Sequence, residues 1–163
     1  MRDERRAAFE GLWREEYARV FRASFLITGD RQEAADVTQE AFARAYERWR
    51  TVSRAERPGA WVQRVAANLA ISWRRRQRLH QRAPQPPGDA PEPEVPDQEL
   101  MAALRALPPA QRAAVVLRHW ADLSIEETAR ALGKRPGTIK ALTSQGLANL
   151  RRSLTKTQEP TTQ

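Results

Sequence analysis

The feature that most constrains the fold is a set of helix-capping and turn residues within 124–139, which mark the start of one helix, its end and the start of a second helix. Ser124 and Glu127 have the spacing of a capping box, in which each side chain satisfies a free backbone N–H at a helix start. Gly133 stands where a left-handed C-cap would end that helix, and Pro136 suits the first turn of the next one. Two helices joined by so short a turn can place the second helix in a DNA major groove. The pattern predicts a helix-turn-helix, and an ordinary helical hairpin is the alternative.

Apolar residues recur at three- and four-residue spacing along most of the chain, which is typical of amphipathic helices. In the last of these helices the inward positions are Ile139, Thr143, Leu147, Leu150 and Leu154. Two further helices are expected before this pair, over residues 98–107 and 109–120. Near the N-terminus the same periodicity predicts helices over 9–25, 30–49 and 58–76, with Asp30 as an N-cap and a polar loop over 50–57. No alternating strand pattern is present, so the sequence predicts an all-α fold.

Proline and acidic residues concentrate in one segment, residues 83–97, which has almost no hydrophobic content. Such a composition favours extended backbone and a semi-rigid linker. The sequence therefore predicts two small helical domains, residues 1–82 and 98–155, joined by this linker and followed by a disordered tail over 156–163.

The charge of the chain narrows the class of partner. The formal net charge is +8 and the sequence pI is about 11.0, yet residues 83–99 hold five acidic and no basic side chains. Two basic bodies thus flank an acidic connector. Basic surfaces attract polyanions and release their counterions, so nucleic acid is the expected partner class.

Several classes of function require residues or segments that this sequence does not contain. The chain has no cysteine, which excludes disulfides and thiolate metal sites. It has no apolar run near the roughly 18 residues that span a bilayer and no secretory leader at Met1, so a cytoplasmic protein without membrane insertion is expected. His80 and His119 are far apart in the sequence. We expect His119 to be a partly buried packing residue. We expect carboxylates such as Glu127 to lie on solvent-facing sides of their helices. We expect no catalytic residues, metal, cofactor or small-molecule substrate.

One segment combines aromatic and basic side chains on a single predicted helix. Trp61, Arg64 and Asn68 share a face by the three- and four-residue rule. They are followed by Trp73, Arg74, Arg75 and Arg76. Indole and guanidinium planes stack on unpaired bases, an Asn amide can read a base edge, and arginines follow phosphates. The segment is compatible with binding to single-stranded or opened nucleic acid, and equally with core tryptophans beside a merely solubilising arginine run.

These segments resemble a known family when they are taken together. Residues 107–151, from LPPAQRAAVVLRHW to the end of the helix-turn-helix, resemble the promoter-recognising fourth region of an extracytoplasmic-function sigma factor. Residues 29–49 (GDRQEAADVTQEAFARAYERW) and 60–76 (AWVQRVAANLAISWRRR) resemble the second region. The two matching segments come in the same order as in the family, with a short linker between them. The amino-acid sequence after Lys140 is similar to that of short actinobacterial members. The resemblance implies a non-enzymatic transcription initiation subunit that binds core RNA polymerase, directs it to promoter DNA and assists melting.

The resemblance also implies roles for particular residues. Those expected to dock on core polymerase are Asp36, Gln39, Glu40 and Arg44. Those expected at the minus-ten element are Trp61, Arg64, Asn68, Trp73, Arg74, Arg75 and Arg76, with Asn68 and the 50–57 loop holding a flipped base. Those expected at the minus-thirty-five element are Arg135, Thr138, Lys140, Ala141, Ser144 and Gln145. The linker is expected to thread through polymerase toward the RNA exit path.

Departures from the family pattern leave the promoter sequence open. Lys140 is followed by Ala141 and Leu142 where the family often has Ser-Arg, and Gln145 replaces a frequent basic residue. The alternatives to a sigma factor are a stand-alone helix-turn-helix regulator of duplex operators and a helical adaptor that binds only protein. An anti-sigma factor is a partner that the resemblance allows, alongside control by phosphorylation or by expression.

Overall fold

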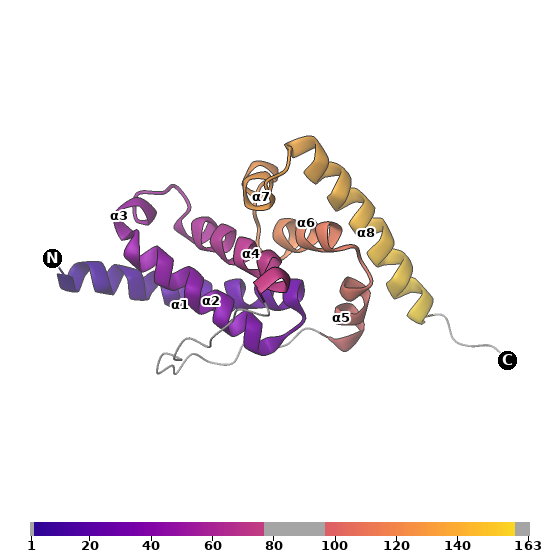
Figure 1. Cartoon of the computed structure of the whole chain (residues 1–163), viewed down its shortest axis with the longest axis horizontal. Helices are drawn as coiled ribbons and strands as arrows, with labels where there is room; N and C mark the ends of the chain where they lie inside the picture. The colour runs from indigo at the N-terminus through magenta and orange to yellow at the C-terminus, as the bar shows by residue number, and fades with distance from the viewer. Residues whose placement is uncertain (1, 77–96, 159–163) are drawn as a thin grey trace.

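The structure, a computed structural model, describes residues 2–76 and 97–158, apart from the side chains of residues 73–76 and 157–158. Within these ranges the chain forms helices and no strand, which confirms the all-α prediction (Figure 1). An N-terminal bundle contains α1 (Arg2–Thr28), α2 (Arg31–Glu47), α3 (Trp49–Val52) and α4 (Pro58–Arg76). A C-terminal bundle contains α5 (Gln98–Arg105), α6 (Pro109–His119), α7 (Ile125–Leu132) and α8 (Pro136–Gln158).

The N-terminal bundle is built around an aromatic core between α1 and α2. The ring of Phe42 is fully buried, and its centroid lies 4.7 Å from that of Trp13 and 6.1 Å from that of Tyr17. Burial raises the pKa of the Tyr17 phenol, because the charged phenolate would lose its hydration there. Asp30 caps α2 as expected, since its side chain accepts a hydrogen bond from the Glu33 backbone N–H at 3.0 Å.

The loop expected over residues 50–57 is helical in its first part. Trp49 and Val52 are 8% and 0% exposed, and the short helix α3 places both against the core. The polar residues between them hid this apolar pair in the sequence pattern. The rest of the loop, up to α4, has no regular structure until Pro58.

The helix-turn-helix has the local geometry that its sequence predicts. Ser124 Oγ accepts from the Glu127 N–H at 3.0 Å, and Glu127 Oε1 accepts from the Ser124 N–H at 2.9 Å, which completes the capping box. Gly133 ends α7 with a left-handed backbone, φ 63°. The helix α8 begins at Pro136. These signals are local, which is why they could be read without tertiary information.

The structure describes part of the predicted C-terminal tail and only the last residue of the predicted linker. The helix α8 continues to Gln158, so residues 156–158 of the expected disordered tail are helical. No apolar residue follows Leu154, so the sequence carries no helical periodicity that could have shown this. The linker prediction, residues 83–97, lies outside the described residues except for Asp97, whose side chain caps α5 by accepting from the Glu99 N–H at 3.1 Å.

The two bundles pack directly against each other, which the sequence did not predict. The helix α7 packs on α4, and α6 packs on α1 (Figure 1). Buried residues of both bundles, such as Val62 of α4 and Ala131 of α7, belong to one contiguous hydrophobic cluster. The contact buries apolar surface from both bundles, so it contributes to the stability of the whole chain.

Among the described residues, no helix has the combination of length and apolar character that crossing a membrane would need.

Candidate nucleic-acid interface

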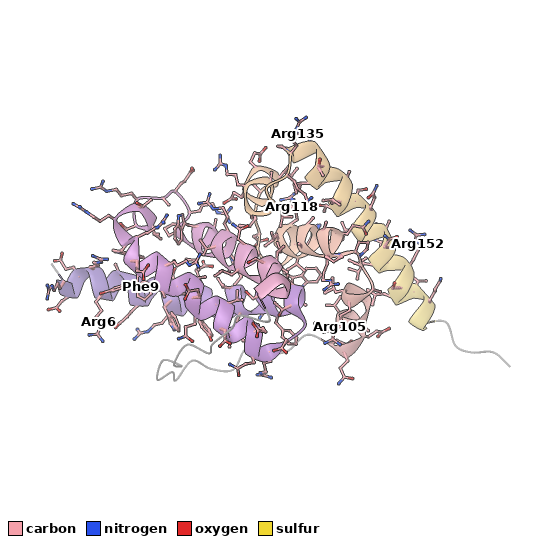
Figure 2. All side chains as sticks on the ribbon, viewed as in Figure 1. Arg6, Phe9, Arg105, Arg118, Arg135 and Arg152 are labelled. Carbon is pink, nitrogen blue, oxygen red and sulfur yellow. The ribbon has the colours of Figure 1, made fainter. Side chains whose placement is uncertain are left out.

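The outer face of α8 is exposed. The residues predicted to contact the minus-thirty-five element are all exposed: Arg135, Thr138, Lys140, Ala141, Ser144 and Gln145. The opposite side of α8 holds Ile139 and Leu150, which are 0% and 6% exposed. Arg135 projects from the N-terminal tip of the helix, away from the rest of the molecule (Figure 2). The helix therefore presents a mixed polar and basic face that nothing in the described chain covers.

The position of α8 depends on its contact with α6. Gly146 is buried where the two helices cross, and nearby Asn149 Nδ2 donates a hydrogen bond of 3.0 Å to Gln111 Oε1. The helix-turn-helix is thus braced by a third helix. Sequence periodicity missed this role of Gly146, although a glycine on an otherwise bulky helix face is a signal of close backbone approach.

The aromatic and basic residues of α4 form a second face on the N-terminal bundle. We call Trp61, Arg64 and Asn68 the reading face of α4. The side chains of Trp61 and Arg64 are half-buried, and Asn68 is exposed. Trp61 packs at the edge of the hydrophobic core, so the core alternative holds for part of its ring. Trp73, Arg74, Arg75 and Arg76 continue α4, but their side chains lie outside the described residues.

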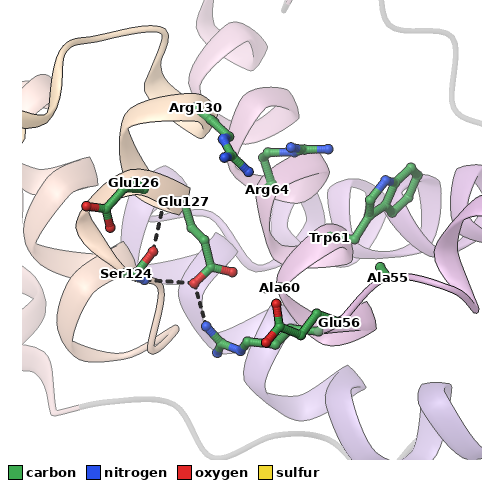
Figure 3. A pocket seen from close by; sticks show the side chains of 10 residues that line it. Ala55, Glu56, Ala60, Trp61, Arg64, Ser124, Glu126, Glu127 and Arg130 are labelled. Carbon is green, nitrogen blue, oxygen red and sulfur yellow. Dashed lines mark hydrogen bonds and ion pairs between the residues drawn. The ribbon is translucent and has the colours of Figure 1, made fainter.

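Two residues of the reading face of α4, Trp61 and Arg64, border a cavity of about 500 Å³. Trp61, Arg64 and Arg57 line one side, and Glu126, Glu127 and Arg130 of α7 line the other (Figure 3). Arg57 forms an ion pair with Glu127, and its Nη2 donates a hydrogen bond of 3.0 Å to the Asp122 carbonyl oxygen. Neither Arg57 nor Asp122 was singled out from the sequence, because no local pattern shows a contact 65 positions apart.

The polar residues predicted to dock on polymerase form one stripe on α2. Asp36, Gln39 and Arg44 are partly exposed and Glu40 is exposed. Arg44 Nε lies 3.0 Å from Glu40 Oε1, and Gln32 Nε2 donates to Asp36 Oδ1 at 3.1 Å. Phe42, on the opposite side, is fully buried. The stripe is a polar surface suited to a protein partner with complementary charge.

Two side chains differ from their sequence expectations. Glu127 was expected on a solvated face, yet it is partly buried between the bundles and pairs with Arg57. His119 was expected to be partly buried and is exposed at the end of α6, because Trp120 turns toward the core instead. Among the described residues, no cluster of His, Cys, Asp and Glu is arranged to hold a metal ion.

Comparison with known proteins gives a family to both bundles. The description "Sigma-70 region 2" matches residues 12–80, and "Sigma-70, region 4" matches residues 97–150. The chain is 38% identical over 150 residues to the RNA polymerase sigma-E factor of Streptomyces coelicolor, covering 86% of this chain and 85% of the relative. This chain belongs to the sigma-70 family.

Other relatives agree with this assignment. The sigma factor is 30% identical over 153 residues to the ECF RNA polymerase sigma factor SigM of Mycobacterium tuberculosis, covering 91% of this chain and 78% of the relative. It is therefore an extracytoplasmic-function member. Its fold is similar to that of the sigma factor RpoE solved in complex with the anti-sigma factor NepR from Bartonella quintana, with a TM-score of 0.65 at 22% identity over 97% of this chain and 98% of that one.

The family assignment places the two faces in different sigma-70 regions. The α4 face lies in the region 2 match, and the exposed face of α8 lies in the region 4 match. The structure brings Trp61, Arg64 and Asn68 together on one helix side. It keeps them on a different bundle from the α8 residues, so the sigma factor carries two separate candidate DNA-contacting faces.

Proposed function

We propose that this sigma factor binds core RNA polymerase, directs it to specific promoters and assists promoter melting. In this proposal the two bundles make different contacts. The N-terminal bundle docks on polymerase through Asp36, Gln39, Glu40 and Arg44. The reading face of α4 meets the minus-ten element. The outer face of α8 reads the minus-thirty-five element. The chain has no catalytic activity of its own in this proposal, and polymerase supplies the chemistry.

The observation that supports the proposal is the presence of two accessible faces of different composition, one on α4 and one on α8, in two different bundles. The outer face of α8 belongs to the second helix of a helix-turn-helix, whose first helix, α7, has a complete capping box; this is the geometry for a duplex major groove. The reading face of α4 offers an indole, a guanidinium and an amide, which is the chemistry for unpaired bases. A protein that both finds duplex DNA and holds an opened strand needs both faces.

Each predicted minus-ten residue has a specific task. The ring of Trp61 is half-buried at its base, which leaves part of the indole available for a base to stack on. Arg64 is one turn further along α4 and can neutralise a phosphate of the same strand. Asn68 is exposed, so its amide can donate to and accept from a base edge.

The exposed residues at and near the start of α8 contribute to DNA binding in two ways: some contribute mainly to affinity and others to base selectivity. Arg135 and Lys140 contribute charge toward phosphates, and Lys140 can also reach a guanine edge. Gln145 can pair with adenine, while Ala141 offers only an apolar contact such as a thymine methyl. This helix therefore reads few base edges directly, and most of its affinity is electrostatic.

Binding measurements separate the proposal from its alternatives. The full chain should co-elute with purified core RNA polymerase in size-exclusion chromatography, and the resulting holoenzyme should protect promoter DNA from nuclease cleavage. The chain alone should give no discrete footprint at the same concentration. A footprint by the chain alone would favour a stand-alone regulator, and binding to polymerase without any DNA protection would favour a protein adaptor.

A further inference from the structure

The residue in the N-cap position of α4 cannot cap the helix. The Trp61 N–H donates the first hydrogen bond of the helix, of 3.2 Å, to the Arg57 carbonyl oxygen, so Arg57 stands in the N-cap position. A guanidinium group has only donors and accepts nothing from the backbone. Pro58 has no N–H, but the N–H groups of Gly59 and Ala60 precede the first helical bond and lack an intrahelical partner. The start of α4 therefore needs a negative charge from another part of the chain.

A carboxylate of α1 lies at this helix start. A methyl group on Gly59 would stand 2.6 Å from Glu16 Cδ, 2.8 Å from Oε1 and 2.9 Å from Oε2. Because the Cα–Cβ bonds of a helix tilt toward its N-terminus, a group in this position lies beside the open end of α4. Glu16 is partly buried, and α1 packs against α4. An anion is favourable at a helix N-terminus, and more so where solvent is partly excluded, so Glu16 supplies the charge that the N-cap position lacks.

Gly59 makes this approach possible. A residue with a Cβ would place that atom in the space of the Glu16 carboxyl group. The backbone of Gly59 does not have the positive φ that favours glycine, and alanine is the better helix former. Neither the backbone conformation nor helix propensity therefore calls for glycine at this position, whereas the close approach of the carboxylate does.

The first turn of α4 also carries the first residue of the reading face. The Trp61 N–H makes the first hydrogen bond of the helix, so fraying of this turn displaces the indole. The base of the ring packs at the edge of the hydrophobic core, which holds one part of the side chain. The backbone that carries the ring depends on the contacts at the helix end. The charge of Glu16 therefore bears on where the indole lies.

We propose that Glu16 is a positioning residue for promoter opening: its carboxylate holds the first turn of α4, so that Trp61 is presented to the opened strand. The inference rests on the proposed role of Trp61 at the minus-ten element. Glu16 touches neither DNA nor polymerase in this proposal and acts through the backbone of α4. No residue of α1 was among those expected at the minus-ten element.

Two substitutions remove the carboxylate from the helix start by different routes. Glu16→Gln removes the charge and keeps the size of the side chain. Gly59→Ala displaces the carboxylate, because the closest neighbours of the new methyl group are all at the flexible end of the Glu16 side chain. That end can move at little cost and alanine favours the helix, so the melting temperature of Gly59→Ala should not fall. Glu15→Gln is the matched control, because it removes the same charge from the neighbouring exposed position of α1.

Amide hydrogen exchange in the free full-length chain measures the first turn of α4. Exchange of the Trp61 N–H should be about two- to fivefold faster in Glu16→Gln, which is the usual effect of losing an anion at a helix start, and unchanged in Glu15→Gln. Gly59→Ala adds helix propensity as well as displacing the carboxylate. Its effect on exchange should therefore be about two- to fivefold less favourable in the unaltered chain than in Glu16→Gln, where no charge remains to be displaced. Unchanged exchange at Trp61 in Glu16→Gln, or equal acceleration throughout the bundle, would overturn the proposal.

Open-complex formation by the holoenzyme links this turn to function. Heparin-resistant complexes on a duplex promoter should fall in Glu16→Gln by up to the same factor, while the affinity for core polymerase stays the same. Trp61→Leu keeps an apolar side chain at the edge of the core and removes the indole. Adding Glu16→Gln to Trp61→Leu should lower opening no further, because Glu16 acts through Trp61. A further loss in the combined variant would assign Glu16 a merely structural role and would overturn the inference.

The same measurements separate the inference from the proposed function. A Trp61→Leu chain that opens the promoter as well as the unaltered chain would contradict the proposed function of the reading face, and the inference with it. A defect in Trp61→Leu without a defect in Glu16→Gln would overturn the inference alone and leave the proposed function in place.

Discussion

Gly146 of α8 lies so close to Val115 of α6 that a methyl group at position 146 would stand 2.6 Å from Val115 Cγ2. The Gln111 carbonyl oxygen would be 3.3 Å from the same methyl group. Val115 is fully buried and β-branched, so it has little freedom to move away. The absence of a side chain at Gly146 therefore sets how closely α8 approaches α6.

The first prediction is that Gly146→Ala destabilises the chain although alanine is the better helix former. Overpacking costs about 1–3 kcal/mol, and the gain in helix propensity of about 1 kcal/mol offsets only part of it. Denaturant unfolding should show a net loss, and adding Val115→Ala should recover part of it by making room. Gly11→Ala is the control, because nothing lies within 4 Å of that position. A Gly146→Ala chain as stabilised as Gly11→Ala would contradict the close approach.

The second prediction concerns docking on polymerase. Reversing Asp36 and Glu40 to Lys should weaken binding to core RNA polymerase at least tenfold, because two charges on one side of α2 change sign. The melting temperature should stay nearly constant, since exposed charges contribute about 0–1 kcal/mol to folding. The control is the double reversal of Glu4 and Glu15, two exposed residues of α1. Equal affinity of the Asp36 and Glu40 variant and the unaltered chain would remove this face from the docking surface.

The local features of the fold could be predicted from sequence, whereas the arrangement of the bundles could not. The capping box of Ser124 and Glu127 involves residues three positions apart, so residue type and spacing suffice. Arg112 reaches the Ile27 carbonyl across 85 positions, and no local pattern encodes such a pair. Helical spacing put Trp61, Arg64 and Asn68 on one face, whereas the docking residues of α2 came from the resemblance to the sigma-factor family. That α7 packs against α4 follows only from the tertiary structure.

The third prediction is that Asn68 acts in holding opened DNA rather than in finding the promoter. Asn68→Ala should lower open-complex formation on a duplex promoter, and should lower it less on a template melted beforehand. Asn68 is exposed and its removal leaves no cavity, so folding should be unaffected. Heparin-resistant complexes on both templates give the comparison. An equal defect on the two templates would mean that Asn68 does not capture a base.

The fourth prediction separates selectivity from affinity on α8. Gln145→Ala should relax the preference at one upstream base position, at a cost of about 1–3 kcal/mol. Lys140→Ala should weaken binding to all sequences and reduce the salt dependence, because phosphate contacts release counterions. Selection of promoters from a randomised library by each holoenzyme distinguishes the two. If both variants select the same upstream motif as the unaltered chain, the outer face of α8 is not the reader.

Transcription from purified components tests sigma activity most directly. Core RNA polymerase is incubated with genomic DNA fragments, with and without the full chain, and the 5′ ends of the transcripts are mapped. The chain should create discrete new start sites that share two upstream motifs, one for each DNA-contacting face, and these sites should be absent with core alone. If the chain binds core and the mapped 5′ ends are nonetheless the same with and without it, the chain is not an initiating sigma factor.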